Sequence, residues 1–127
     1  MRYLIVLAVL GLAACVEEPM DGRTSYLENC ASCHGAGGQG DGPAARGLTT
    51  SPPDLTQISA RNGGVFPTDQ VMSIIDGLDR VPHFSAAMPE FGAGDLGDTV
   101  IVENDGLGTP VPIELLLLTE YLQSIQQ

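Results

Sequence analysis

The sequence predicts an all-α domain of about four short helices joined by long irregular loops. Three observations support this class. Apolar residues recur at helical spacing in four segments, Gly and Pro residues gather between those segments, and a Cys-x-x-Cys-His run begins within the first of them. The length of 127 residues fits one domain, but 16 Gly, 9 Pro and no Trp leave little for a core of large side chains.

The first and last helices are predicted over residues 22–32 and 112–125. Asp21 suits the N-cap of the first helix, because its side chain can accept a hydrogen bond from a backbone N–H of the first turn. Pro112 and Glu114 suit the first turn of the last helix, where proline is tolerated and a carboxylate is favoured. Apolar residues support the last helix: Ile113, Leu116, Leu117, Tyr121 and Ile125.

Two shorter helices are predicted in the middle of the chain, over residues 54–61 and 68–76. We expect Thr68 to cap the second of these helices and Gly77 to stop it. Residues 35–53 contain many Gly and Pro among other turn-forming residues. This segment is therefore predicted to be a long irregular loop.

A small β-hairpin is predicted near residues 99–107. The β-branched run at 99–102 suits a strand, and Asn-Asp-Gly at 104–106 suits the turn that follows. The stretch 95–108 is also acidic, but it lacks the alternating Asp pattern of a calcium-binding loop. We therefore interpret its carboxylates as solvated side chains.

The chain is strongly acidic, which limits its partners. Five Arg, no Lys and sixteen Asp or Glu give a net charge of −11, so the surface repels phosphate backbones and nucleic-acid binding is excluded. Residues 81–127 contain seven Asp or Glu and no Lys or Arg. This distribution fits a merely solvated face, or a field that steers encounters with a basic protein surface.

The N-terminus has the pattern of an export signal. Arg2 precedes an apolar run that is too short to span a bilayer, and small residues precede Cys15. This pattern resembles that of bacterial lipoproteins, whose cysteine is acylated after cleavage, and the alternative is an ordinary signal peptide. We predict a signal peptide at 1–14, a lipidated tether at 15–20 and one folded domain at 21–127. The protein would then be anchored to a membrane and face the periplasm, with the inner or outer membrane left open.

Cys30, Cys33 and His34 form the pattern of covalent c-type haem attachment. Two thiols at this spacing can each form a thioether with a haem vinyl group, and the adjacent imidazole can then coordinate the iron. A redox dithiol is the main alternative. A zinc site would need a second pair of ligands, and the other histidine, His83, has no cysteine near it. We therefore predict one covalently bound haem c with its iron.

The sixth iron ligand has three candidates. Met88 precedes Pro89, which biases it toward an extended conformation in a stiff loop, so its thioether is the favoured ligand. His83 lies in the same loop and is the second candidate. Met72 falls within the helix predicted at 68–76, where a core methionine is the better interpretation.

In order along the chain, these motifs resemble class I cytochromes c. The resemblance covers residues 20–127 and is carried by Gly22, Tyr26, Cys30-x-x-Cys33-His34-Gly35, Gly40-Asp41-Gly42-Pro43, Met88-Pro89 with Phe91, and Leu118-x-x-Tyr121-Leu122. The stretch 95–108 has no counterpart in compact members of that family.

The resemblance implies a cytochrome c fold in which the helices wrap around one haem. In this family the first and last helices cross, with Gly22 and Tyr26 of the first packed on Tyr121 of the last. It also implies that a proline carbonyl accepts a hydrogen bond from the Nδ1 atom of His34. Pro43, nine residues after His34, fits that place.

A haem iron held by His34 and Met88 has no open position, so the expected function is electron transfer and not enzymatic catalysis. Arg46, Arg61 and Arg80 are candidates to bind the haem propionates, or to pair with surface acids instead. We expect redox proteins as partners, and either a monomer or a subunit of a respiratory complex. The alternatives are the haem subunit of a periplasmic dehydrogenase or oxidase, and a haem sensor or peroxidase-like enzyme with an exchangeable ligand.

Overall fold

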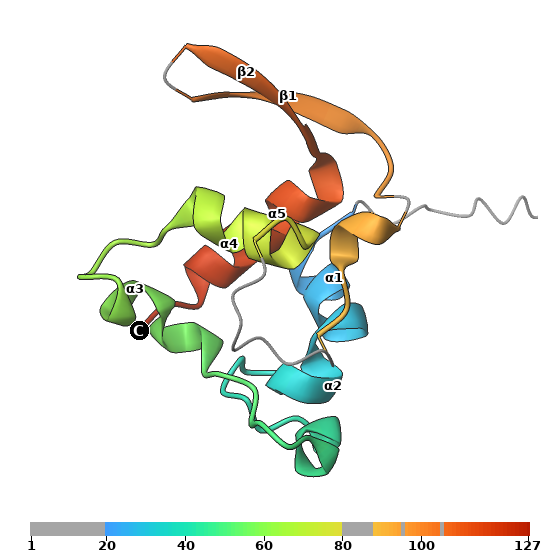
Figure 1. The fold of residues 1–127 in the computed structure, drawn as a ribbon, viewed down its shortest axis with the longest axis vertical. Helices are drawn as coiled ribbons and strands as arrows, with labels where there is room; N and C mark the ends of the chain where they lie inside the picture. The colour runs from blue at the N-terminus through green and yellow to red at the C-terminus, as the bar shows by residue number, and fades with distance from the viewer. Residues whose placement is uncertain (1–19, 80–87, 95, 105) are drawn as a thin grey trace, which may run out of the picture.

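The computed structural model describes residues 20–79, 88–94, 96–104 and 106–127, although the side chain of residue 104 is excluded (Figure 1). The proposed lipidation site Cys15, and also Arg80 and His83, lie outside these residues. The prediction of a mainly helical domain with a small hairpin is confirmed. The α-helices are α1 (Gly22–Asn29), α2 (Ala31–His34), α3 (Ile58–Arg61), α4 (Thr68–Asp76) and α5 (Ile113–Ser124). The 3₁₀ helices are η1 (Pro43–Gly47), η2 (Leu55–Gln57) and η3 (Phe91–Ala93), and the strands are β1 (Thr99–Asn104) and β2 (Leu107–Pro112).

Helices α1 and α5 pack against each other although they come from opposite ends of the chain (Figure 1). A side chain at Gly22 would overlap the carbonyl oxygen of Leu117, so glycine permits the close approach of the two backbones. One turn further along α1, the ring of Tyr26 lies 5.2 Å from the ring of Tyr121 between centroids, at an interplanar angle of 47°. The implied packing of Tyr26 on Tyr121 is confirmed, whereas Gly22 meets the backbone of Leu117 and not Tyr121.

The predicted first helix is interrupted at Cys30. Asp21 caps α1 as expected, since its side chain accepts a hydrogen bond from the backbone N–H of Arg23 at 3.2 Å. α1 ends at Asn29, and after Cys30 the chain turns again into the short helix α2. The break gives the residues of the Cys-x-x-Cys-His motif a helical turn of their own.

The middle helices follow the predicted ranges, with one correction. Gly77 adopts a left-handed conformation, with φ of 92°, and stops α4 as expected. Thr68, however, is the first helical residue of α4 and not its cap. The N-cap position is held by Pro67, with no hydrogen bond from its side chain, because the chain enters the helix one residue earlier than the Thr signal suggests.

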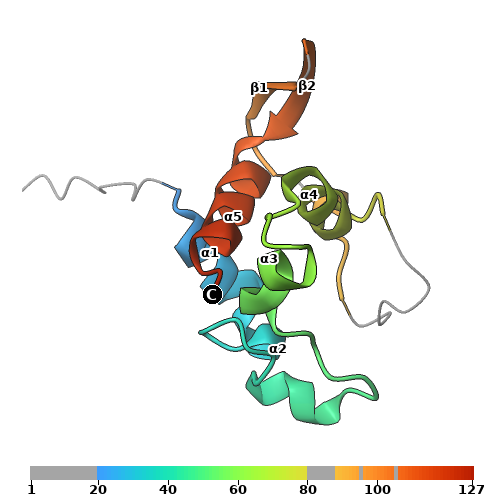
Figure 2. The same cartoon turned by 90° about the vertical axis from the view of Figure 1, so that its left-hand side faces the viewer.

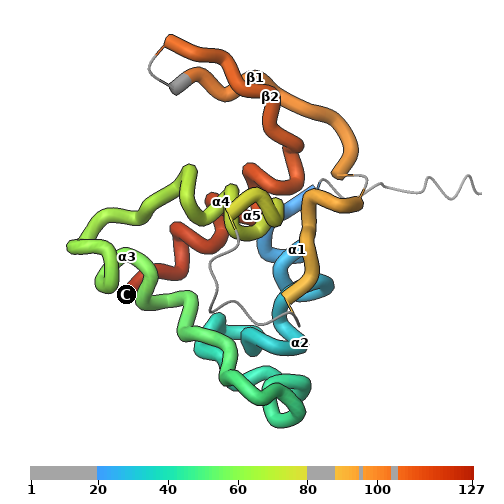
Figure 3. The backbone as a smooth tube through the Cα atoms, in the orientation of Figure 1, coloured from blue at the N-terminus to red at the C-terminus, as the bar shows by residue number. Residues whose placement is uncertain are grey.

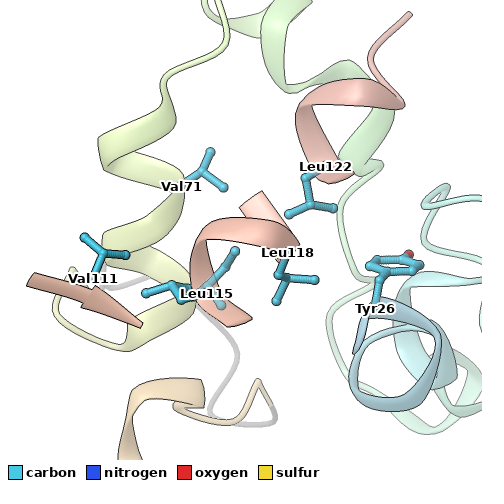
Figure 4. Packing of buried hydrophobic residues seen from close by; sticks show 7 residues of the cluster. Tyr26, Val71, Val111, Leu115, Leu118 and Leu122 are labelled. Carbon is cyan, nitrogen blue, oxygen red and sulfur yellow. The ribbon is translucent and has the colours of Figure 1, made fainter. Parts of the chain in front are cut away.

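The core lies where α5 meets α1 and α4 (Figure 4). Leu118 is fully buried between Tyr26 and the α4 side, and Leu115 and Leu122 continue its face of α5. These residues are not those that the helical spacing selected. Four consecutive leucines make α5 apolar around most of its circumference, so the pattern could not identify the buried face.

The hairpin is antiparallel, with Thr99 opposite Pro112 and Asn104 opposite Leu107. It projects beyond the helices, at the end of the molecule opposite to α2 (Figures 1 and 2). In the described parts of the chain, no helix is both long enough and apolar enough to cross a membrane.

Candidate functional site

A cavity of about 910 Å³ opens between α2, α3, α4, the segment 88–94 and α5. This volume is typical of sites for small molecules and cofactors, as is the mostly apolar wall. Cys30, Cys33, His34 and Met88 all line the cavity. The structure therefore brings together residues that are separated by more than fifty positions in the sequence.

The two cysteines are free thiols, and both are half-buried. The backbone N–H of Cys33 donates to the carbonyl oxygen of Cys30 at 3.2 Å, so a single turn places both residues on the cavity wall. Burial, and secondarily the neighbouring Cys33, raises the pKa of Cys30 to about 11. Cys30 is therefore a protonated thiol at neutral pH, unlike the reactive thiolate of a redox dithiol.

His34 is the last residue of α2 and lines the cavity. Its Nδ1 atom lies 3.4 Å from the carbonyl oxygen of Pro53. Burial lowers the pKa of His34, and the hydrogen bond to Pro53 opposes this shift in part. The imidazole is therefore neutral at neutral pH. With its proton on Nδ1, shared with Pro53, the lone pair of Nε2 is available to a metal.

The acceptor for His34 is Pro53, nineteen residues further along the chain, and not Pro43. The expectation for Pro43 is wrong because the chain at this point forms η1, an exposed 3₁₀ turn that Pro43 begins. The loop then returns to the site (Figure 3). The backbone N–H of Leu55 donates to the carbonyl oxygen of Gly38 at 2.7 Å, and this contact holds the return segment against the loop that follows His34.

Two further backbone hydrogen bonds fix the start of this loop on α2. The N–H of Gly40 donates to the carbonyl oxygen of His34 at 2.8 Å, and that of Gly42 donates to Cys33 at 3.1 Å. A side chain at Gly42 would overlap the backbone of α2. The segment 35–53 is thus tied to the motif at both ends.

Met88 and Met72 have different surroundings. Met88 is half-buried and lines the same cavity as the Cys-x-x-Cys-His motif, although it lies far from the motif in the sequence. Met72 is also half-buried, but it lines a separate groove between α4 and the hairpin. Of the two methionines, only Met88 shares a cavity with His34. The third candidate, His83, lies outside the described residues.

Polar residues also line the cavity. Arg61 is on its wall and donates a hydrogen bond from Nη2 to the carbonyl oxygen of Asp54 at 2.8 Å. Arg46 is exposed on η1 and is not among the described residues that form the wall. The sequence did not point to several other polar residues on the wall, among them Asn62, Gln70 and Glu90. Nothing in their sequence context distinguishes them from ordinary surface residues.

Glu114 is a further residue of the wall that sequence reasoning assigned only to the start of α5. Its Oε1 atom accepts a hydrogen bond of 2.7 Å from the hydroxyl of Ser25 on α1. This bond links the first and last helices beside the cavity. Among the described residues, no group of three His, Cys, Asp or Glu side chains is placed to hold a metal ion without a cofactor.

Comparison with protein families matches more than half of the chain. The family model described as cytochrome c matches residues 19–98, a range that includes the Cys-x-x-Cys-His motif, Pro53 and Met88. No curated protein and no solved structure matches the chain. The family match ends before β1, so the hairpin and α5 lie beyond it.

Proposed function

Because the chain belongs to the cytochrome c family, whose members bind haem c covalently and transfer electrons, we propose that it is a single-haem electron carrier with His34 and Met88 as the iron ligands. One observation carries the ligand assignment. Met88 and His34 line the same cavity, whereas Met72 lines a different one.

The residues of the cavity fit haem c. Cys30 and Cys33 are free thiols one helical turn apart, as covalent attachment requires. His34 is neutral and is oriented by Pro53, so its Nε2 atom can serve as a ligand. Arg61 stands on the wall as a donor for a propionate.

When bound, haem c supplies a one-electron couple between ferrous and ferric iron. The side chains of His34 and Met88 would both hold the iron and would leave no ligand position for oxygen, peroxide or a substrate. This arrangement favours electron exchange over catalysis. A methionine ligand and an apolar wall both disfavour the additional charge of ferric iron, so they raise the reduction potential relative to ligation by two histidines.

The proposal includes a membrane anchor and a basic partner. Acylation of Cys15 would hold the domain at a membrane surface facing the periplasm. Redox partners with basic surfaces would match the net charge of −11. Labelling of the expressed protein with a radioactive fatty acid tests the anchor, since a Cys15→Ser variant should lose all label. Label that survives this substitution would contradict it.

Replacement of Met88 by Ala tests the iron ligands. The variant should bind carbon monoxide in the ferrous state, and its reduction potential should fall, because an open or water-filled position replaces the thioether. Met72→Ala is the matched control, since it removes the same side chain from the neighbouring groove. Its reduction potential and its lack of carbon monoxide binding should match those of the unmodified protein.

A different result for Met88→Ala would change the assignment of the second iron ligand. If Met88→Ala left the spectrum and the potential unchanged, Met88 would not be the ligand, and a parallel His83→Ala variant would show whether the imidazole takes that position. Rapid carbon monoxide binding by the unmodified protein would instead favour a sensor or peroxidase-like role.

A further inference from the structure

The β-hairpin is an exposed apolar arm on an otherwise acidic protein. Ile101 is 65 % exposed and Leu107 is 74 % exposed, and Leu78, just after α4, is 80 % exposed. Isolated two-stranded hairpins are only marginally stable, and within the described residues no third strand pairs with β1 or β2. Unpaired strand edges with exposed apolar side chains are typical of protein contact sites.

The two faces of the hairpin have different surroundings. Val102 and Val111 contribute to the face that packs on the helical core. Ile101, the residue before Val102, belongs to the other face, because side chains alternate along a strand. The hairpin is therefore anchored by one face and leaves the other to solvent.

A groove of about 240 Å³ runs between the anchored face and α4. Its apolar lining includes Met72, Val102 and Leu115, and its polar lining includes Asp69 and Asp76. An apolar channel with carboxylates beside it suits a Lys or Arg side chain, whose aliphatic stem packs on apolar surface while its charged end stays near the acids.

The charge around the groove indicates which kind of partner could bind there. Among the described residues, the lining of the groove includes Asp69 and Asp76 and no Lys or Arg, and the whole chain carries a net charge of −11. A second copy of the chain would bring the same negative charge to the contact, and anionic lipid would repel it as well. A basic protein surface is the complementary partner.

The position of the hairpin separates this contact from the haem motif. In both views the hairpin lies at one end of the molecule and α2 at the other (Figures 1 and 2). A partner bound at the hairpin would leave the end that carries Cys33 and His34 accessible. We propose that the hairpin and the groove beside it form a docking site for a basic protein, which inserts a Lys or Arg side chain next to Asp69 and Asp76.

This inference goes beyond electron transfer, because it assigns a contact that need not cover the haem. It is tested by photo-crosslinking in the source cells, with a photoreactive amino acid at Ile101 and, as the control, at Ala44, an exposed residue of η1. Position 101 should give an adduct with one protein, joined through a peptide that contains Lys or Arg, and salt should weaken the adduct. Position 44 should not give it.

Two sets of variants test the groove. Asp69→Asn with Asp76→Asn should lower the adduct yield about tenfold, the effect of losing about 1.4 kcal/mol of charge pairing. Glu28→Gln with Glu120→Gln removes the same charge from exposed positions elsewhere, and its yield should change little. Thr109→Arg would fill the groove from within, so it should reduce the yield without removing any acid.

The results separate this proposal from the proposed function. The haem absorbance of each variant reports whether the haem site is intact. A normal spectrum together with no adduct at 101, an adduct shared with position 44, or an adduct only with lipid or with a second copy would overturn the docking site. A chain that never acquires haem would overturn the proposed function instead.

Discussion

The hydroxyl group of Tyr26 donates a hydrogen bond of 2.6 Å to the carbonyl oxygen of Gly35, the residue that follows the haem motif. Tyr26 is fully buried and its ring also packs on Tyr121. This one side chain therefore joins three parts of the protein: α1, α5 and the end of α2. The haem motif is attached to the crossing of the two terminal helices through it.

Replacement of Tyr26 by Phe should lower the free energy of unfolding by about 1–3 kcal/mol, because a buried carbonyl group loses its partner while the ring packing is kept. Chemical denaturation of the haem-loaded protein measures this change. Tyr121→Phe is the matched control and should cost less, because Tyr121 is only half-buried. Equal losses in the two variants would contradict the role given to the Tyr26 hydroxyl.

Stability should decline at alkaline pH through the same residue. Burial is the main cause that raises the pKa of Tyr26 in the folded protein above its ordinary value of 10.0. Its contribution to stability is complete below pH 10.0 and is lost as the pH rises above that value. The free energy of unfolding, measured from neutral to alkaline pH, should therefore fall less steeply for Tyr26→Phe. An unchanged slope would show that another group controls the alkaline loss.

Replacement of Gly22 by Ala should separate the terminal helices. The new methyl group would overlap the carbonyl oxygen of Leu117, and neither backbone can yield cheaply. A loss of about 1–3 kcal/mol in unfolding free energy is expected from such overpacking. Gly37→Ala is the control, since open space surrounds that position. If the two variants were equally stable, the close contact of α1 and α5 would be in doubt.

Replacement of Leu118 by Ala tests the centre of the core. Leu118 is 0 % exposed, so its truncation should leave a cavity and cost about 2–5 kcal/mol in unfolding free energy. Leu78→Ala makes the same chemical change at a residue that is 80 % exposed, and should shift stability by no more than about 0.5 kcal/mol. Thermal or chemical denaturation compares the pair. A small loss at Leu118 would mean that the core lies elsewhere.

Local patterns predicted most of the helices and the hairpin. The Asp21 cap and the Gly77 stop depend on a few neighbouring residues, and both are visible in the sequence. The buried face of α5 could not be read from the sequence. Its four consecutive leucines offer several apolar faces, and only the positions of α1 and α4 determine which face is buried. The burial of Leu118 is therefore determined by tertiary packing and not by the periodicity of the sequence.

Some residues of the candidate site could also be predicted from local sequence patterns, and others could not. The attachment motif and the proposed ligand Met88 lie in short sequence patterns, so both could be proposed without a structure. The hydrogen-bond partner of His34 could not be predicted from the sequence, because η1 lengthens the loop and Pro53, not Pro43, reaches the imidazole. Distant residues such as Gln70 and Glu114 join the wall only through the fold.

The most direct measurement is the absorbance of the chain after expression in a cell that attaches haem to c-type cytochromes, followed by denaturation and extraction with acidified organic solvent. The haem colour should stay with the polypeptide, and a Cys30→Ser, Cys33→Ser variant should lose it to the solvent, since thioether bonds survive this treatment and coordination does not. A colourless chain, or a haem that the solvent removes from the unmodified protein, would contradict the account.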